Sequence, residues 1–402
     1  MTQSGLKAIF YYIVLINCCI MAHGQSNADY GNGIRNIYLS GTLGVINYNY
    51  DFSILEPGYT ASGVSAKNTF AGRFAVGYHL SEHWDAQFSV MRPAAWTKYE
   101  QLSIDGSDQT VWTNIWALTA KYNFNLTNKY SMYFETGLSN VTRNGIELGD
   151  FLIVGDAHYL YPIFGSGLNW RLNGKWQFNL NATYSPPKND IDQPATTFIG
   201  LGTIFSAKRP DDQVIARNAN TPFAFPKKML QLGYTSDVAG FDINRQFSGG
   251  LPTSIPLFWL GDVFVKKGVF ATYQQTVLHT YKNFSLEWGL SAGLYETKND
   301  ETFYALSAYP LIKWWFLRSK ATDVYFNYSL IGPAYISKSR LDGIDTGEEA
   351  TFQDFMGIGF LFGENRKLNI DLRISHYSNG NIFTENPGVA VPLMLSFGYA
   401  LY

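Results

Sequence analysis

A histidine and a serine stand two residues apart near the C-terminal end of the chain, at His376 and Ser378. They continue a segment in which apolar residues take the even positions, namely Leu368, Ile370, Leu372 and Ile374, and polar residues take the odd positions. Because alternate side chains of a β-strand share a face, His376 and Ser378 should lie side by side. An imidazole beside a hydroxyl can accept its proton, so the pair predicts a serine nucleophile with a histidine base. Asn379 could then stabilise an oxyanion.

Segments with this alternation recur through the chain after residue 24 and predict β-strands. In the first half we predict strands at 36–49, 68–80, 83–92, 110–124, 129–140, 157–171, 175–185 and 196–206. Short turns and long loops alternate strictly between them, as in outer-membrane barrels, which have tight periplasmic turns and longer external loops. A soluble β-sandwich is the alternative, but it would not sort its loops by length in this way.

The composition also fits a membrane barrel. Aromatic residues make up 16% of the 402 residues and charged residues only 15%, and aromatic side chains form girdles at both membrane interfaces of such barrels. The mean hydropathy of −0.10 is too low for a bundle of membrane helices, because each helical span needs about 20 mostly apolar residues. The formal net charge of −2 gives no indication of a nucleic-acid partner.

The first 24 residues are predicted to be a secretory signal peptide, with Lys7 in the basic region and an apolar stretch after it. An uncleaved anchor helix is the alternative, but the apolar stretch is short for a membrane span. The two cysteines of the chain, Cys18 and Cys19, lie in this segment. We therefore expect no disulfide, no thiolate metal site and no cysteine nucleophile in the exported chain. No metal and no cofactor are predicted.

Residues 207–254 interrupt the alternation with several prolines and glycines and are predicted to be a linker, with one extra strand at 229–234. In the second half we predict strands at 256–265, 269–278, 283–295, 303–316, 323–333, 351–362, 366–378 and 391–402. The break is far longer than a periplasmic turn. The fold class is therefore all-β, with two tandem eight-stranded transmembrane antiparallel barrels at residues 25–206 and 255–402. One sixteen-stranded barrel is the alternative.

An even number of strands, with both ends on the periplasmic side, makes the strand that carries His376 and Ser378 run outward. The pair then lies at the external end of that strand, on its apolar side, at the level of the outer leaflet. A polar pair is costly there unless it has a function, and hydrolysis of a lipid ester fits the position. A chance His-x-Ser at a polar strand end is the alternative, since the chain contains 6 histidines.

A family resemblance appears at these residues. The stretch His376-Tyr377-Ser378-Asn379-Gly380, followed by Asn386-Pro387-Gly388 and a final strand, resembles the PagL-like lipid A deacylases, as do Thr351-Phe352-Gln353-Asp354 and Gly357-Ile358-Gly359-Phe360 upstream. The resemblance extends over residues 255–402. It implies an eight-stranded barrel that hydrolyses an ester-linked acyl chain, with lipid A or lipopolysaccharide of the outer leaflet as its partner in the outer membrane. A homodimer is compatible with it.

In that family the histidine, the serine and an acidic residue early in the last strand form a triad, and the asparagine helps to build the oxyanion hole. His376, Ser378 and Asn379 match this pattern. The acid does not match, because counting without gaps puts it at Ala390, and the nearest carboxylate is that of Glu385 in the preceding loop. We therefore expect Glu385 to orient the imidazole. A missing orienting group would weaken catalysis without necessarily abolishing it.

Two functions follow from these residues. The first is an outer-membrane esterase that acts on lipid A with Ser378 and His376. The second is a non-enzymatic barrel pair, serving as scaffold, adhesin or receptor, in which the two residues are relics. The match of His376, Ser378 and Asn379 favours the first function, and Ala390 favours the second. The first barrel resembles only small outer-membrane barrels in general, so the sequence assigns it no activity.

Overall fold

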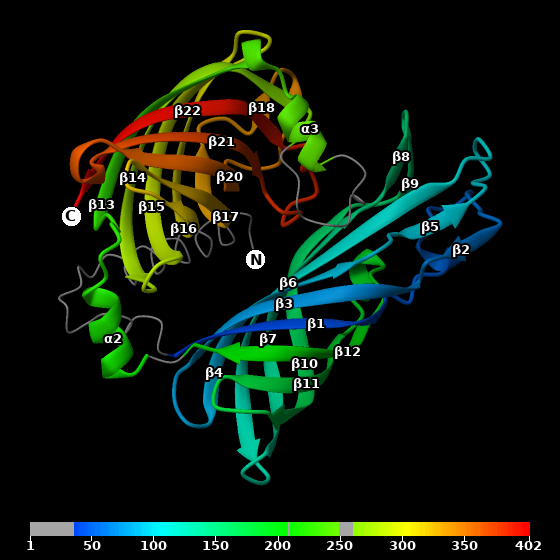
Figure 1. Cartoon of the computed structure of the whole chain (residues 1–402). Coiled ribbons are helices and arrows are strands. Elements are labelled where there is room, and N and C mark those ends of the chain that lie inside the picture. The colour runs from blue at the N-terminus through cyan, green and yellow to red at the C-terminus, as the bar shows by residue number, and fades with distance from the viewer. Residues whose placement is uncertain (1–35, 208–209, 249–259) are drawn as a thin grey trace.

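The structure, a computed structural model, describes residues 36–207, 210–248 and 260–402, which form two closed antiparallel barrels (Figure 1). Eight strands form the first barrel: β1 (Ile37–Asn47), β3 (Asn68–His79), β4 (Trp84–Pro93), β6 (Gln109–Asn125), β7 (Tyr130–Asn144), β10 (Ala157–Arg171), β11 (Trp176–Ser185) and β12 (Thr196–Ser206). The ring closes because β12 pairs with β1 and β6 pairs with β7. Its long connections carry β2 (Gly63–Ser65), β5 (Thr97–Glu100), β8 (Ile146–Leu148) and β9 (Phe151–Val154).

The second barrel also has eight strands: β13 (Lys228–Ser236), β14 (Val263–His279), β15 (Phe284–Thr297), β16 (Thr302–Arg318), β17 (Thr322–Ile336), β20 (Ala350–Phe362), β21 (Leu368–Ser378) and β22 (Val389–Leu401). It closes through β13, which pairs with both β14 and β22. The short strands β18 (Arg340–Leu341) and β19 (Ile344–Asp345) form a hairpin in one connection, and two short helices, α2 (Asp212–Ala219) and α3 (Asp242–Ser248), flank β13. Among the described residues, no helix is long and apolar enough to cross a membrane.

The prediction of two tandem barrels is confirmed, and the alternative of one sixteen-stranded barrel is wrong. Strand β12 returns to β1 of its own barrel along its whole length, from the pair Tyr38 and Ser206 to the pair Asn47 and Thr197. The eight strands predicted in the first half are all present, and β10 and β12 have the predicted bounds. The predicted signal peptide, residues 1–24, lies outside the described residues.

Two predictions about the second half are wrong. Residues 207–254 are not only a linker: the extra strand predicted at 229–234 is present as β13, and it belongs to the second barrel, which it closes. The strands predicted at 256–265 and 269–278 are, in their described part, the single strand β14. A bulge between Val265 and Lys267 shifts the register within β14, and such an extra residue interrupts the two-residue alternation from which a continuous strand is recognised. Residues 208–209 and 249–259 lie outside the described residues.

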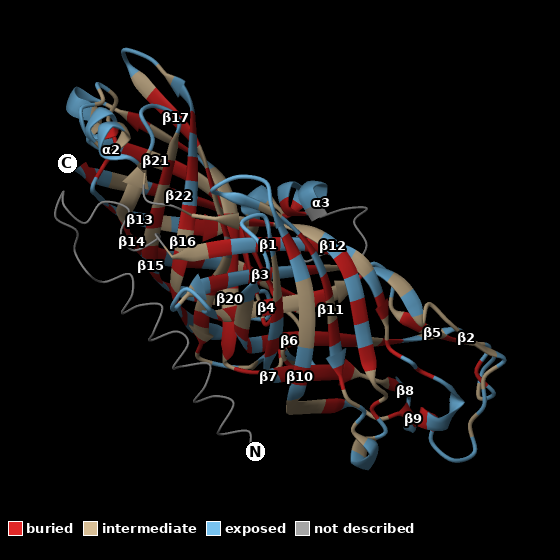
Figure 2. Ribbon diagram, turned by 90° about the horizontal axis from the view of Figure 1, so that it is seen from below, coloured by how far each residue is buried: buried red, intermediate tan, exposed pale blue. Residues whose placement is uncertain are grey.

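Side chains alternate between the outside and the inside of each barrel, which Figure 2 shows as bands of exposed and buried residues along the strands. In β3, for example, Phe70 and Phe74 are exposed on the outer wall, while Arg73 and Ala75 are buried in the lumen. Exposed large apolar residues cover the outer walls of both barrels, among them Leu118, Leu138, Leu232, Leu306 and Phe397. An apolar outer belt of this kind is the surface that a barrel presents to lipid.

Charged and polar side chains fill both lumens. In the first barrel Arg73 Nη1 lies 2.8 Å from Glu135 Oε1, and Gln87 donates to Glu135 Oε2 at 3.0 Å. In the second barrel Lys313 Nζ lies 2.8 Å from Glu287 Oε2, and Arg373 Nε lies 2.6 Å from Asp371 Oδ1. Side chains fill the interior of eight-stranded barrels in this way, which leaves the outer wall and the loops as the surfaces where ligands can bind.

Both barrels have three short connections at one end and most of their long connections at the other; in the second barrel the connection between β15 and β16, residues 298–301, is also short. The short connections of the second barrel join β14 to β15, β16 to β17 and β20 to β21. In Figure 1 the long connections marked by β2, β5 and β8 lie towards the right of the picture, β18 lies on the right-hand side of the second barrel, and the C-terminus and α2 lie towards the left. The two barrels therefore share one orientation, with the end of β21 on the external side.

We predict that Glu135→Gln destabilises the first barrel, because Arg73 and Lys121 would keep their charges in the lumen without the carboxylate. Removing one partner of a buried ion pair costs about 3–5 kcal/mol, so the urea midpoint for unfolding from lipid vesicles should fall clearly. Asp108→Asn is the control, since its pair with Lys98 is largely exposed and should leave the midpoint unchanged. Equal midpoints for the two variants would contradict the prediction.

Candidate active site at the external end of β21

His376 and Ser378 lie at the external end of β21 and point outward. Their neighbours Ser375 and Tyr377 are buried in the lumen, where the Tyr377 hydroxyl lies 3.4 Å from that of Tyr295. Strand alternation then puts His376 and Ser378 on the opposite, outer side. His376 is only 8% exposed, and Ser378 is half-buried. The two residues therefore lie on the same face of β21.

A carboxylate that the sequence analysis did not select contacts His376. Asp354 on β20 is the direct cross-strand partner of His376, and its Oδ1 is hydrogen-bonded to His376 Nδ1. Asp354 is 7% exposed, so the pair is shielded from water. A carboxylate on Nδ1 fixes the imidazole so that Nε2 is the nitrogen that can accept a proton from a hydroxyl.

The expected role of Glu385 is therefore corrected: Asp354, and not Glu385, provides the carboxylate at His376. Strand β21 has two neighbours, and His376 faces Ala390 on β22 and Asp354 on β20. The family's acid was expected at Ala390, beside the histidine on the last strand. Here a carboxylate lies at the equivalent place on the other neighbouring strand. Either position can reach the imidazole, because directly opposed side chains lie about 4.5–5.5 Å apart at Cβ.

The sequence contained a signal for Asp354. Strands β20 and β21 are joined by a tight turn and pair without a register shift from Phe362 and Leu368 up to Phe352 and Ser378. Counting the same number of residues back from the turn as forward to His376 reaches Asp354. An acid in the outward series of Phe352, Met356, Ile358 and Phe360 is also out of place on a lipid-facing wall. The count required the exact position of the turn, which the alternation alone did not fix.

The surroundings of Glu385 also argue against an orienting role. Glu385 lies in the connection between β21 and β22, outside the spanning strands. Burial raises the pKa of its carboxyl, and the charges of Asp156, Asp345 and Glu147 raise it further. Glu385 thus lies among other acids of the loops, whereas the cross-strand partners of His376 are Asp354 and Ala390.

Asn379 is placed next to Ser378, but its side-chain amide is engaged elsewhere. Nδ2 donates to the main-chain carbonyls of Thr346, at 3.2 Å, and Glu385, at 2.6 Å. The two hydrogens of the amide are thus used within the loops, and Asn379 is 1% exposed. Its main-chain N–H donates to Asn386 Oδ1 at 2.8 Å. In this conformation Asn379 holds the loop, and it could donate to an oxyanion only by releasing one of these carbonyls.

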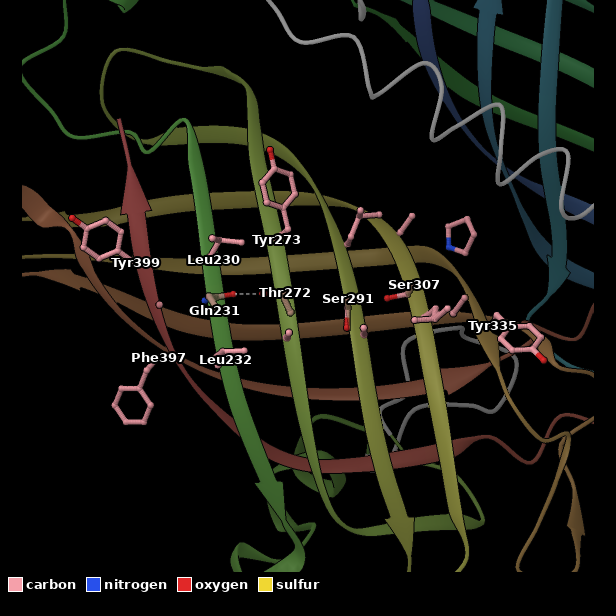
Figure 3. Close-up of a pocket in the computed structure, with 18 of the residues that line it drawn as sticks. Leu230, Gln231, Leu232, Thr272, Tyr273, Ser291, Ser307, Tyr335, Phe397 and Tyr399 are labelled. Carbon is pink, nitrogen blue, oxygen red and sulfur yellow. Dashed lines mark hydrogen bonds between the residues drawn. The ribbon is translucent and has the colours of Figure 1, made fainter.

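A large depression of about 990 Å³ lies elsewhere on the wall of the second barrel (Figure 3). Outward-facing apolar side chains line it, including Leu230 and Leu232 of β13, Tyr273 of β14 and Phe397 of β22. None of Ser378, His376 and Asp354 is among its lining residues. The described part of the chain also contains no group of three or more His, Cys, Asp or Glu side chains that could hold a metal ion. The depression is part of the lipid-facing belt and is separate from the candidate site.

We predict that Asn379→Ala loosens the connection after β21. Two hydrogen bonds are lost, each worth about 0.5–1.5 kcal/mol net, so amide exchange of residues 380–386 should speed up by roughly ten- to a hundredfold. Thr384→Ala is the control, because Thr384 contributes its main-chain carbonyl to the structure and the variant keeps that group. Unchanged exchange in Asn379→Ala would show that the amide does not hold the loop.

Comparison with known proteins gives a match in the second barrel. Residues 262–400 match the model of a family described as lipid A 3-O-deacylase (PagL). A relative named lipid A deacylase PagL, from Bordetella bronchiseptica, is 30% identical over 93 residues, which make up 23% of this chain and 48% of the relative. The chain therefore spans about half the length of that curated relative.

Two solved structures of small outer-membrane barrels each match less than half of the chain. The outer membrane enzyme PagL is 16% identical, with 44% of this chain and 99% of that chain covered and a TM-score of 0.28. The outer membrane protein OprG from Pseudomonas aeruginosa is 14% identical, with 43% and 97% covered and a TM-score of 0.30. The chain is an outer-membrane β-barrel protein, and its resemblance to the PagL-like lipid A deacylases is confirmed over residues 262–400 of the second barrel.

Proposed function

We propose that the second barrel is an esterase that hydrolyses an ester-linked acyl chain of lipid A in the outer leaflet. Ser378 is the nucleophile, His376 is the base, and Asp354 orients the imidazole. The observation that carries the proposal is the buried hydrogen bond between Asp354 and His376 on the outer wall. A carboxylate and an imidazole are costly on a lipid-facing wall. They lie on the same face as a serine, within the segment that matches the deacylase family, and activation of that serine would explain why they are there.

The reaction proceeds in two steps in this proposal. Ser378 Oγ attacks the ester carbonyl while its proton passes to His376 Nε2, and the carbonyl oxygen becomes an oxyanion. Asp354 stabilises the imidazolium that forms. When the oxyanion collapses, the bond to the lipid A alcohol breaks and His376 returns the proton to the leaving oxygen. Water then attacks the acyl-serine with His376 again as base, which releases the fatty acid and restores Ser378.

The position of the site explains why a lipid would be the substrate. Ile370 and Leu372 lie outward on β21 below His376 and are partly exposed. Their side chains continue the face that carries Ser378, so an acyl chain can lie along the wall while its ester reaches the serine. The site opens on the outer wall and not into the lumen, which polar side chains fill. A substrate that is itself embedded in the outer leaflet fits this arrangement.

A non-enzymatic barrel remains the second candidate. Ala390 at the position of the family's acid and the engaged amide of Asn379 favour it. Asp354 argues against it, because a buried acid paired with the histidine is costly on a lipid-facing wall and would have no function in an inactive site. The two candidates differ in whether Asp354 affects the chemistry.

Ser378→Ala and His376→Ala should each abolish deacylation while the protein still folds. Both side chains lie on the outer wall, so neither change removes packing from the lumen. Mass spectrometry of lipid A from cells making each variant measures the loss, and a gel-mobility shift on heating shows that the barrels are folded. Ser396→Ala is the control, since Ser396 faces the lumen of β22. The double variant should lose no more than either single one, because the two residues act as a unit. Fully acylated lipid A in cells that make the folded wild-type protein would contradict the proposal.

Asp354→Asn and Glu385→Gln separate the two candidate acids. Losing the orienting carboxylate of a triad lowers the rate by about 10⁴ in the best-studied case, so Asp354→Asn should reduce deacylation by several orders of magnitude. Glu385→Gln should leave the rate within about threefold, because the amide keeps the shape of a side chain that does not contact the imidazole. The reverse ranking in an assay on purified protein and lipid A would restore Glu385 as the orienting residue.

A further inference from the structure

The outer wall of the first barrel carries a polar patch that interrupts its apolar belt. Asn114 and Trp116 on β6, and Asn140 and Thr142 on β7, point outward, since Thr113, Ile115 and Val141 between them are buried in the lumen. Asn114 and Thr142 are fully buried, and Asn140 and Trp116 are each 8% exposed. Further along the same two strands, outward residues such as Leu118 and Leu138 are about half exposed. We call Asn114, Trp116, Asn140 and Thr142 the polar patch.

The polar patch is covered by the connection that follows Ser378 in the second barrel. Asn114 Nδ2 donates to the Gly380 carbonyl at 2.9 Å, and Trp116 Nε1 donates to the same oxygen at 3.2 Å. Asn140 Nδ2 and the Thr142 hydroxyl donate to the Ile382 carbonyl, at 2.9 and 2.5 Å. Side-chain donors of one barrel thus satisfy main-chain carbonyls of the other. The two barrels lie next to each other at this point (Figure 1).

Aromatic contacts extend the interface on both sides of these hydrogen bonds. The Trp116 ring stacks on Phe352, with ring centroids 5.9 Å apart, and Phe352 is the direct cross-strand partner of Ser378. The His158 ring of the first barrel lies 5.3 Å from that of Phe383. A side chain at Gly380 would approach the Trp116 ring to 3.1 Å. Glycine suits this position both because of that contact and because its φ is +63°.

The contacts therefore lie next to the candidate nucleophile, at its cross-strand partner Phe352 and in the connection that follows it. The connection begins directly after Ser378, with Asn379 as its first residue, and Gly380 and Ile382 are the points at which the first barrel holds it. Reacting groups must be held to about 0.5 Å for efficient catalysis, and most of that precision comes from supporting residues. Loops are the least rigid part of a barrel, so a clamp on this loop controls the geometry around Ser378.

We propose that the first barrel is a positioning partner of the active site, and that its polar patch holds the connection after Ser378 in the conformation needed for deacylation. This inference rests on the proposed esterase function. It gives the first barrel a role, which the sequence did not assign. The residues of the patch act through the loop and do not touch the reacting atoms, with Trp116 nearest to them through Phe352.

The test compares the full-length chain with the triple variant Asn114→Leu, Asn140→Leu and Thr142→Val. Misplacement of reacting groups by about 1 Å can cost about a hundredfold in rate, so kcat for purified lipid A should fall roughly ten- to a hundredfold with little change in KM. Thr136→Val and Trp170→Leu are matched controls, since both residues lie on the outer wall of the first barrel and are exposed. They should leave kcat unchanged. A triple variant that is folded and keeps kcat within about threefold overturns the inference.

A structural readout separates this inference from the proposed function. In a background in which Cys18 and Cys19 are replaced by serine, His158→Cys and Phe383→Cys should be joined by a short bismaleimide. His158→Cys paired with Leu294→Cys, which lies on an exposed part of β15, should not be joined. Failure of the first pair to react in the folded protein overturns the inference.

A spin label on Thr384→Cys reports on the loop itself. The label should be immobile in the otherwise unchanged chain and mobile in the triple variant. If the wild-type protein does not deacylate lipid A, the proposed function fails and the label decides alone: increased mobility in the triple variant supports the clamp, and unchanged mobility overturns it.

Discussion

A polypeptide that crosses lipid has to pair every backbone N–H and C=O within itself, because the hydrocarbon offers no partner for them. For strands this means that each sheet must close, and both sheets of this protein do so, through β1 with β12 and through β13 with β22. The alternation of side chains, the filled lumens and the apolar walls follow from that closure. It also explains why β13 belongs to the second barrel. Without that strand, β14 and β22 would each be left with an open edge over most of their length.

Polar side chains on the outer walls stand out against this background. Two sets of them are buried in the described structure, the pair of Asp354 and His376 on the second barrel and the polar patch on the first. Each set has its hydrogen-bonding partners: the acid and the imidazole pair with each other, and the patch pairs with main-chain carbonyls of the connection between β21 and β22. Along the chain, Ser378 and Asn379 lie between His376 of the first set and Gly380, which the patch contacts. Both sets of buried polar side chains are therefore located near Ser378.

The carboxylate beside His376 is on β20, whereas the sequence motif placed it on β22. In a barrel, an acid can therefore move to the other neighbouring strand and still lie opposite the same histidine. A residue in a central strand has two cross-strand neighbours, and both lie at similar distances on the same face. At His376 these neighbours are Ala390 and Asp354. An acid on either strand can orient the imidazole. A motif written along one strand therefore misses a group supplied by the next, and the chemistry has to be judged from the register between strands.

The sequence by itself determined the elements that depend on local periodicity. The alternation of apolar and polar residues predicted the two barrels and most of their strands. The spacing of His376 and Ser378 placed both on the outer face of β21. The sequence indicated a strand at 229–234 but not that this strand, β13, closes the second barrel, because the partners of a strand are not visible in its own segment. It also did not determine the continuity of β14, because the bulge interrupts the period of two.

Only the tertiary structure decided which residues surround the histidine and the serine. Asp354 reaches His376 through the register of two strands joined by a turn, and Asn114, Asn140 and Thr142 reach the loop after Ser378 from a different barrel, more than 200 residues away along the chain. Glu385, close in sequence, does not take the place at the imidazole. Contacts of this kind depend on how sheets close and pack against each other, and closure is a property of the whole ring of strands that no single segment of the sequence contains.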